Sequence, residues 1–313
     1  MSAAPTGPPG RGARDGARPG YVDAHVHLWD PGLLTYPWLT GTAGLDRPFH
    51  APDLLAAARS AGAPPAGVVV VEADRLPRQA LAEARWVLAA STPELPVVGA
   101  VAHVPFGPGT GPATTAAALD DLAGLDGLAG ARRLLQDEPP GFLARPEVVA
   151  GVAAIGARGL PFDLCVRSRQ LPEAVDLVRR LPAVEFVLDH LGKPRISADT
   201  YGPWADDLRR LAALPNVRCK LSGLATEADP DHRAASDLLP FLRHALDVFG
   251  PGRCLFGSDW PVLTLATTYD HWLDVVLQAV DDLDAAERDL VLRGNAVATY
   301  TRPLVTAPGR RCS

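Results

Sequence analysis

The chain has 313 residues, with 30 Lys and Arg against 36 Asp and Glu, a formal net charge of −6, and 47% hydrophobic residues. This is a globular composition, and the mild acidic excess without clustered Lys and Arg argues against binding to nucleic acid or anionic lipid. No apolar stretch approaches the ~20 residues of a membrane-spanning helix. The length allows two domains at about 150 residues each, whereas an α/β barrel uses about 250 residues as one domain.

Residues 1–20 are rich in Pro and Gly and contain no apolar core of a secretory signal. We expect a disordered arm over 1–20, one barrel domain over 21–303 and a tail over 304–313. The four cysteines, at 165, 219, 254 and 312, form no CxxC pair. Buried thiols in a reducing cytoplasm are the expectation.

Short β-rich runs recur after the arm, with helical patterns between them. Most are continuous apolar runs, which is typical of parallel strands buried on both faces. Their starts lie 22 to 47 residues apart, enough for strand–helix–strand crossovers. The eight predicted strands are 21–26, 68–73, 97–102, 131–135, 162–166, 184–188, 217–221 and 254–257.

The segments between the strands have recognisable helix ends. Pro172 begins a predicted helix over 171–181, and Pro240 and Gly250 bracket another over 237–250. The last predicted helices cover 269–282 and 285–300. Eight strand–helix units predict a (β/α)8 TIM barrel. An open doubly wound sheet is the alternative, but the first strand ends in DAHVH where a dinucleotide-binding fold would carry GxGxxG.

Three polar residues at strand ends are candidates for the chemistry. His25 and His27 are two residues apart on a strand, so their imidazoles point the same way and can hold a metal or an anionic oxygen. Asp259 follows the eighth strand, which neighbours the first once the barrel closes. It is the candidate general base and a candidate third metal ligand. The structural alternatives are backbone-bonded histidines and a turn-capping aspartate.

A further histidine and its neighbour follow the sixth strand. His190 is a candidate catalytic residue, as a metal ligand, a donor to a carbonyl or a proton shuttle. Asp189 faces the other way and can orient a neighbour, with a buried capping role as the alternative, and a structural histidine is the alternative for His190.

Other polar and aromatic residues are candidates for substrate binding. Arg132 and Arg133 are adjacent in the fourth strand, so only one can face inward. Lys220 and Ser222 share a face of the seventh strand, where a lysine is costly unless it is paired. Trp29, with Tyr36 and Trp38, is expected to wall one side of the pocket, with core packing as the alternative.

Six segments together resemble a known family. They are DAHVHLWD (23–30), LTYPWL (34–39), RRLLQDEP (132–139), VLDHLGKP (187–194), CKLSGL (219–224) and FGSDWP (256–261). In this order they resemble the amidohydrolase-related TIM-barrel lactonases of the sugar-lactone type, over roughly 21–303.

The resemblance implies that water opens an aldonolactone or a related carboxylated lactone, with Asp259 as base. It matches His25 and His27 to the strand-one pair and His190 to the strand-six histidine. The fourth and fifth predicted strands offer no lysine and no histidine, so a two-metal centre is not expected. For the cofactor, two alternatives are left: one divalent metal such as Zn²⁺, or no metal.

The expected partner is a small-molecule lactone, and a homo-oligomer stays open. Two rival functions stay open as well. One is a metal-dependent decarboxylase of the same superfamily, and the other is a barrel that binds a sugar acid without turnover.

Overall fold

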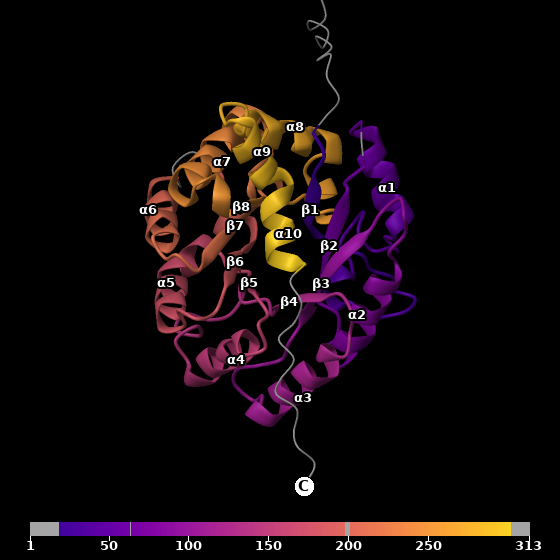
Figure 1. Cartoon of the computed structure of the whole chain (residues 1–313), viewed down its shortest axis with the longest axis vertical. Helices are drawn as coiled ribbons and strands as arrows, with labels where there is room; N and C mark the ends of the chain where they lie inside the picture. Colours follow the sequence, from indigo (N-terminus) through magenta and orange to yellow (C-terminus); the bar gives the residue numbers. More distant parts are fainter. Residues whose placement is uncertain (1–18, 63, 198–200, 302–313) are drawn as a thin grey trace, which may run out of the picture.

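Eight parallel strands form one sheet in the order β1 to β8 in the computed structural model, which describes residues 19–62, 64–197 and 201–301 (Figure 1). The predicted (β/α)8 barrel is confirmed. The strands are β1 (Val22–Val26), β2 (Gly67–Val71), β3 (Val97–His103), β4 (Leu128–Arg132), β5 (Phe162–Leu164), β6 (Phe186–Leu188), β7 (Val217–Leu221) and β8 (Cys254–Phe256).

Helices accompany this sheet, and most of them form an outer ring around it (Figure 1). They are α1 (Ala51–Ser60), α2 (Ala80–Ala89), α3 (Pro112–Ala123), α4 (Pro146–Gly156), α5 (Leu171–Arg180), α6 (Tyr201–Ala212), α7 (Ala235–Phe249), α8 (Tyr269–Ala279), α9 (Ala285–Asp289) and α10 (Asn295–Tyr300). The predicted helix over 285–300 is helical throughout, with a π-helical turn at Leu290–Gly294 between α9 and α10.

The barrel closes between β1 and the segment after β8. Val26 pairs in parallel with Trp260, and the backbone N–H of His27 donates to the Trp260 carbonyl over 2.7 Å. The backbone N–H of Asp259 donates to the His25 carbonyl over 2.8 Å. The ends of β1 and β8 are therefore adjacent, as the barrel topology requires.

The apolar core has two layers. The larger lies between the strands and the helices, and the smaller lies inside the barrel, with members from β1, β2, β3, β4, β6 and β8. Ala296 and Tyr300 of α10 complete this inner layer. Helix α10 crosses the centre of the ring in Figure 1, where it contacts β1, β3, β4 and β8. The barrel is thus filled by side chains, with Tyr300 as a plug.

The fourth strand differs from its prediction. It spans Leu128–Arg132 instead of 131–135, because pairing with β3 aligns Ala131 with Ala102 and Arg132 with His103. Gly130 of this strand is closely surrounded, since a Cβ there would lie 3.2 Å from Val101 Cγ2 and 3.4 Å from the Tyr300 ring. The predicted strand at 131–135 therefore overlaps β4 only at Ala131 and Arg132.

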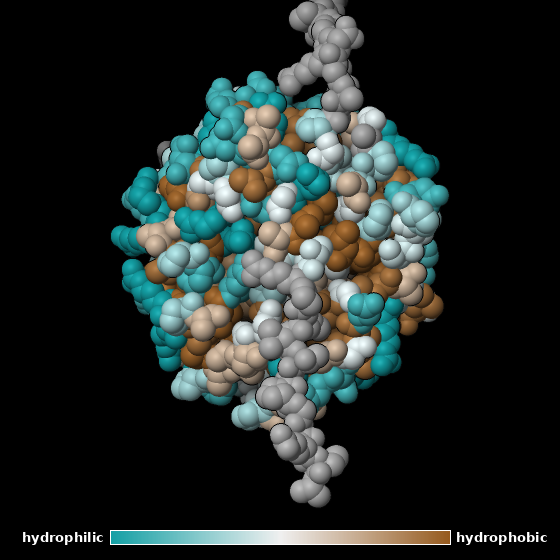
Figure 2. Space-filling model, in the orientation of Figure 1, coloured by the Kyte–Doolittle hydropathy of each residue, from teal (hydrophilic) through white to brown (hydrophobic). Residues whose placement is uncertain are grey.

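The surface in this orientation shows hydrophilic residues on the helices around the rim and hydrophobic residues between them (Figure 2). Cys165, Cys219 and Cys254 are buried free thiols. Within the described ranges, no helix is long and apolar enough to cross a membrane. The predicted arm and tail lie almost wholly outside the described residues.

Candidate active site

The ends of β1 and β8 bring together two imidazoles and a carboxylate. His25 Nε2 and His27 Nε2 are 3.2 Å apart, and Asp259 Oδ1 lies 3.7 Å from the first and 3.3 Å from the second. A register shift in β1 between Asp23 and Val26 accompanies this arrangement. Asp23 bonds instead to the Ser258 N–H and the Tyr269 hydroxyl, which ties β1 to β8 and α8.

These ligand atoms suit a metal ion. The Nδ1 of His27 lies 2.8 Å from the Val71 carbonyl, which accepts its proton and leaves Nε2 as a lone pair facing the group. The His27 Nε2 lone pair, His25 Nε2 and Asp259 Oδ1 converge on one point. A bound proton or cation at that point would reduce the repulsion between these electron-rich atoms. Nitrogen and carboxylate oxygen are ligands that Zn²⁺ takes. The donor set His25, His27 and Asp259 therefore fits one divalent ion.

His190 extends this group from the end of β6. Its Nδ1 lies 2.8 Å from Ser222 Oγ, and its Nε2 lies 3.9 Å from Asp259 Oδ1. Burial lowers the pKa of His190 to about 4, so the imidazole is neutral at neutral pH. Burial alone would raise the pKa of Asp259, but His190, His27 and His25 hold it well below its usual range. Asp259 is therefore an ionised carboxylate in contact with three imidazoles.

A charge network supports His25 from below. His25 Nδ1 lies 3.2 Å from Asp189 Oδ1 and 3.1 Å from Lys220 Nζ. Lys220 also pairs with Asp163, whose second oxygen accepts from the Tyr300 hydroxyl over 2.7 Å. Burial and the Lys220 charge keep the pKa of His25 well below its usual value. His25 is thus held neutral and fixed in orientation.

Arg132, at the end of β4, is held by two acidic residues that follow β2 and β6. Its Nε lies 2.8 Å from Glu72 Oε1, its Nη2 donates to the Glu72 carbonyl over 2.5 Å, and its Nη1 lies 3.1 Å from Asp189 Oδ2. Burial opposes the charge of Glu72, but Arg132 and Arg75 lower the pKa of this carboxyl to about 2. These contacts fix the guanidinium as part of the wall.

A cavity of about 250 Å³ opens beside this group, at the ends of the strands. Its lining combines the reactive group with polar side chains from four strand ends. The lining residues are His27, Trp38, Ala73, Asp74, Arg132, Leu134, Gln136, Asp137, Cys165, His190, Lys193, Asp259 and Val262.

The cavity wall carries unusual backbone. Five described non-glycine residues have positive φ, and four of them line this cavity: Asp74, His190, Lys193 and Asp259. The left-handed conformation costs such residues about 1–3 kcal/mol each and clusters at functional sites. This concentration makes the cavity the candidate functional site of the barrel mouth.

The structure divides the predicted substrate-binding residues. Arg132 lines the cavity, whereas Arg133 bonds to Glu138 over 2.6 Å and stacks against Phe142, so only one of the two arginines faces inward, as predicted.

Three other candidates lie behind the wall. Lys220 and Ser222 are fully buried against His25 and His190, and neither lines the cavity. Trp29 is buried too, and its indole donates to the Arg47 carbonyl over 2.9 Å. It packs edge-on against Trp38, which does line the cavity. The packing favours supporting roles for all three over direct contact with a substrate.

Polar lining residues that sequence reasoning missed come directly after strands. Asp74 follows β2, Gln136 and Asp137 follow β4, and Lys193 follows β6. Lys193 belongs to the segment VLDHLGKP (187–194), but no role is predicted for it from the sequence. The signal that points to all four is a polar residue within a few positions of a parallel strand's carboxyl end.

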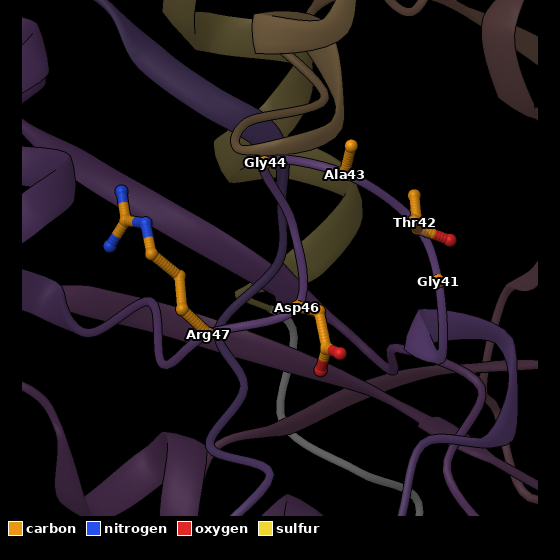
Figure 3. A pocket seen from close by; sticks show the side chains of 6 residues that line it. All are labelled: Gly41, Thr42, Ala43, Gly44, Asp46 and Arg47. Carbon is orange, nitrogen blue, oxygen red and sulfur yellow. The ribbon is translucent and has the colours of Figure 1, made fainter.

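A second hollow, of about 360 Å³, lies in the loop between residues 41 and 47 (Figure 3). The side chains of Asp46 and Arg47 point away from each other there. The Arg47 guanidinium lies 3.7 Å from the centre of the Phe49 ring. None of the residues that line this hollow is a buried charged one, in contrast to the first cavity.

Comparison with known proteins agrees with this geometry. The amidohydrolase family profile matches residues 22–302. The L-fucono-1,5-lactonase of Burkholderia multivorans is 36% identical over 300 residues, which covers 90% of this chain and 96% of that protein. The enzyme of the same name from Burkholderia ambifaria is 33% identical, over 89% of this chain and 94% of its own length.

Solved structures give the same result. An amidohydrolase from Burkholderia multivorans with bound Zn superimposes with a TM-score of 0.77 and 33% identity, over 91% of this chain and 100% of that one. The predicted resemblance is thereby confirmed. Since the family profile covers almost the whole barrel and the relatives match over most of their length, the chain belongs to the amidohydrolase family and is a hydrolase.

Proposed function

We propose that the protein hydrolyses a sugar lactone at the cavity beside β1 and β8, with Asp259 as the general base. One observation carries the proposal: an ionised carboxylate in a strand-end cavity stands 3.3 to 3.9 Å from three histidine Nε2 atoms. The family match and the two lactonase relatives support lactone hydrolysis as the reaction.

The reaction needs a base, and Asp259 meets the requirement. Its pKa lies well below neutral, so it is ready to accept a proton from a water molecule that attacks the lactone carbonyl. The water oxygen bonds to the carbonyl carbon, the ring C–O bond then breaks, and the departing ring oxygen takes up a proton. The product is a hydroxy acid.

His190 is the candidate partner of Asp259. When the Ser222 hydroxyl donates to Nδ1, the ring proton sits on Nε2, directed towards Asp259 and the cavity. A neutral imidazole with a pKa of about 4 donates a hydrogen bond to a carbonyl or ring oxygen without adding a charge.

His25, His27 and Asp259 would hold one divalent ion of the zinc type. When bound, it supplies Lewis-acid polarisation of the carbonyl. The related amidohydrolase structure with bound Zn supports a zinc ion as the metal. The protein residues still position the substrate and move the proton.

A pH-stat screen of sugar lactones, including L-fuconolactone and L-rhamnonolactone, tests the function. Each lactone is measured with a no-enzyme blank, with added Zn²⁺ and with chelator. We expect acid release above the blank for at least one lactone, and less after chelation. Release of CO₂ from carboxylated aromatic acids without lactone turnover would instead establish the decarboxylase alternative. Saturable binding without turnover would leave a binding barrel.

A further inference from the structure

A rare left-handed turn follows β6. His190, Leu191, Gly192 and Lys193 have φ values of 52°, 55°, 72° and 48°, and the Lys193 N–H donates to the His190 carbonyl over 2.8 Å. Residues three apart in such a tight turn lie on the same side. His190 and Lys193 accordingly both line the cavity. The turn is costly for three non-glycine residues, and its effect is to bring these two side chains together.

Lys193 is a cation with unused donors in the cavity wall. Its side chain is 16% exposed, and its Nζ lies 3.5 Å from Glu227 Oε1, longer than a direct hydrogen bond. An ammonium has three donors. Among the described residues that line the cavity, the other cation is Arg132, whose donors are spent on Glu72 and Asp189.

The environment keeps this ammonium charged. Burial alone would lower the pKa of Lys193, but Cys165, Glu227 and Asp259 outweigh burial and raise it. Lys193 and Asp259 line the same cavity. The ammonium faces the place where the reaction occurs, and its negative partner Glu227 stands beside it.

We infer that Lys193 binds the negative charge that ring opening creates on the oxygens of the substrate's carbonyl carbon. This inference rests on the proposed lactonase function. As water adds and the ring C–O bond breaks, the neutral lactone group becomes a carboxylate. Of the two protons of the attacking water, one passes by way of Asp259 to the departing ring oxygen and the other is released to the solvent. The ammonium contacts this charge as it develops and then holds the product carboxylate.

Glu227 tempers the attraction. An anion 3.5 Å from the ammonium offsets part of the cation's attraction for the product carboxylate. The two residues should therefore act in opposite directions on product affinity. A merely structural role for the pair would move product affinity in the same direction in both variants, because either substitution breaks the same contact.

The test uses the full chain and four variants, Lys193→Gln, Lys193→Arg, Glu227→Gln and Arg195→Gln. Arg195 is the matched control, since it is a cation two residues further along the loop whose side chain is 74% exposed. For each protein we measure kcat, KM, inhibition by the ring-opened acid, and direct binding of L-fuconate by calorimetry. Circular dichroism confirms that each variant is folded.

We expect Lys193→Gln to weaken binding of the acid about ten- to a hundredfold, the loss typical of a charge-assisted hydrogen bond. The same variant should lower kcat/KM by a similar factor. Lys193→Arg should restore part of the binding, Glu227→Gln should tighten it several-fold, and Arg195→Gln should leave it unchanged.

Unchanged acid binding in folded Lys193→Gln, with lactone turnover in the wild type, overturns the inference and leaves the lactonase function standing. Equal weakening in Lys193→Gln and Glu227→Gln also overturns it. If the wild type binds L-fuconate through Lys193 but opens no lactone, the anion site stands and the proposed function falls. If it neither binds nor turns over, both fall.

Discussion

The mouth of the barrel and the interior just beneath it contain the same kinds of residue in opposite states. In the interior, Lys220, Asp163 and Tyr300 are fully buried and bonded to one another. At the mouth, Asp259 and Lys193 face a cavity and retain unused donors or acceptors. A buried charge whose partners are all protein groups stabilises the structure, whereas a charge that faces a cavity is available to a ligand. Residue type alone does not separate the two.

Asp259→Asn should have the largest effect on activity. The amide accepts no proton from water, so kcat/KM for a lactone that the wild type hydrolyses should fall about 10²–10⁴-fold. Initial rates in a pH-stat measure this, with Asp46→Asn, an exposed residue of the 41–47 loop, as the control. Wild-type rates in Asp259→Asn would show that another residue acts as the general base.

Lys220→Met should have the largest effect on stability. It leaves Asp163 and Asp189 without their shared cation inside the barrel, and loss of one partner from a buried ion pair costs about 3–5 kcal/mol. Urea unfolding followed by circular dichroism measures the free energy of unfolding. A decrease of less than 1 kcal/mol would show that the buried ion pairs of Lys220 do not stabilise the fold.

The buried neutral histidine makes stability depend on pH. His190 has a pKa of about 4 when folded against an ordinary 6.5, so between these values the unfolded chain binds the proton and the folded chain does not. The contribution of neutral His190 to the free energy of unfolding is therefore complete above pH 6.5. As the pH falls from 6.5 towards 4, the free energy of unfolding decreases by up to about 1.4 kcal/mol per pH unit. His190→Gln should reduce the slope of unfolding free energy against pH in this window. An unchanged slope would contradict the burial of a neutral imidazole.

The adjacent residues Arg132 and Arg133 allow the same comparison between a buried charge and a partly exposed one. Arg133→Gln removes a partly exposed ion pair to Glu138, so we expect a stability loss of about 0–1 kcal/mol and near-wild-type activity. Arg132→Gln removes a guanidinium bonded to Glu72 and Asp189, and should lower both stability and activity clearly. Parallel thermal melts and lactone assays of the two variants check this, and equal effects would argue against their opposite placement.

Part of this site follows from local pattern. Two histidines two residues apart at the end of a strand share a face, and a barrel joins its first and last strands, so His25, His27 and Asp259 were predicted to meet. Their distances agree with that expectation. Their catalytic and metal-binding roles remain predictions.

Other features depended on packing between distant segments. Pairing with β3 places β4 at Leu128–Arg132 instead of at the apolar run 131–135, and Tyr300 of α10 packs inside the barrel with residues of this strand. Trp29 was a candidate for the pocket, but it packs behind Trp38. Neither outcome is visible in the periodicity of the segment itself.

The sequence by itself determined the barrel, because the periodicity of each strand and helix is local to its own segment, and closure of eight such units then places β8 beside β1. Only the tertiary structure decided which charges are saturated and which face the cavity. It also decided the left-handed turn that turns Lys193 inward. The physical reason is that burial and pairing are properties of neighbours in space, and those neighbours come from strands far apart in the chain.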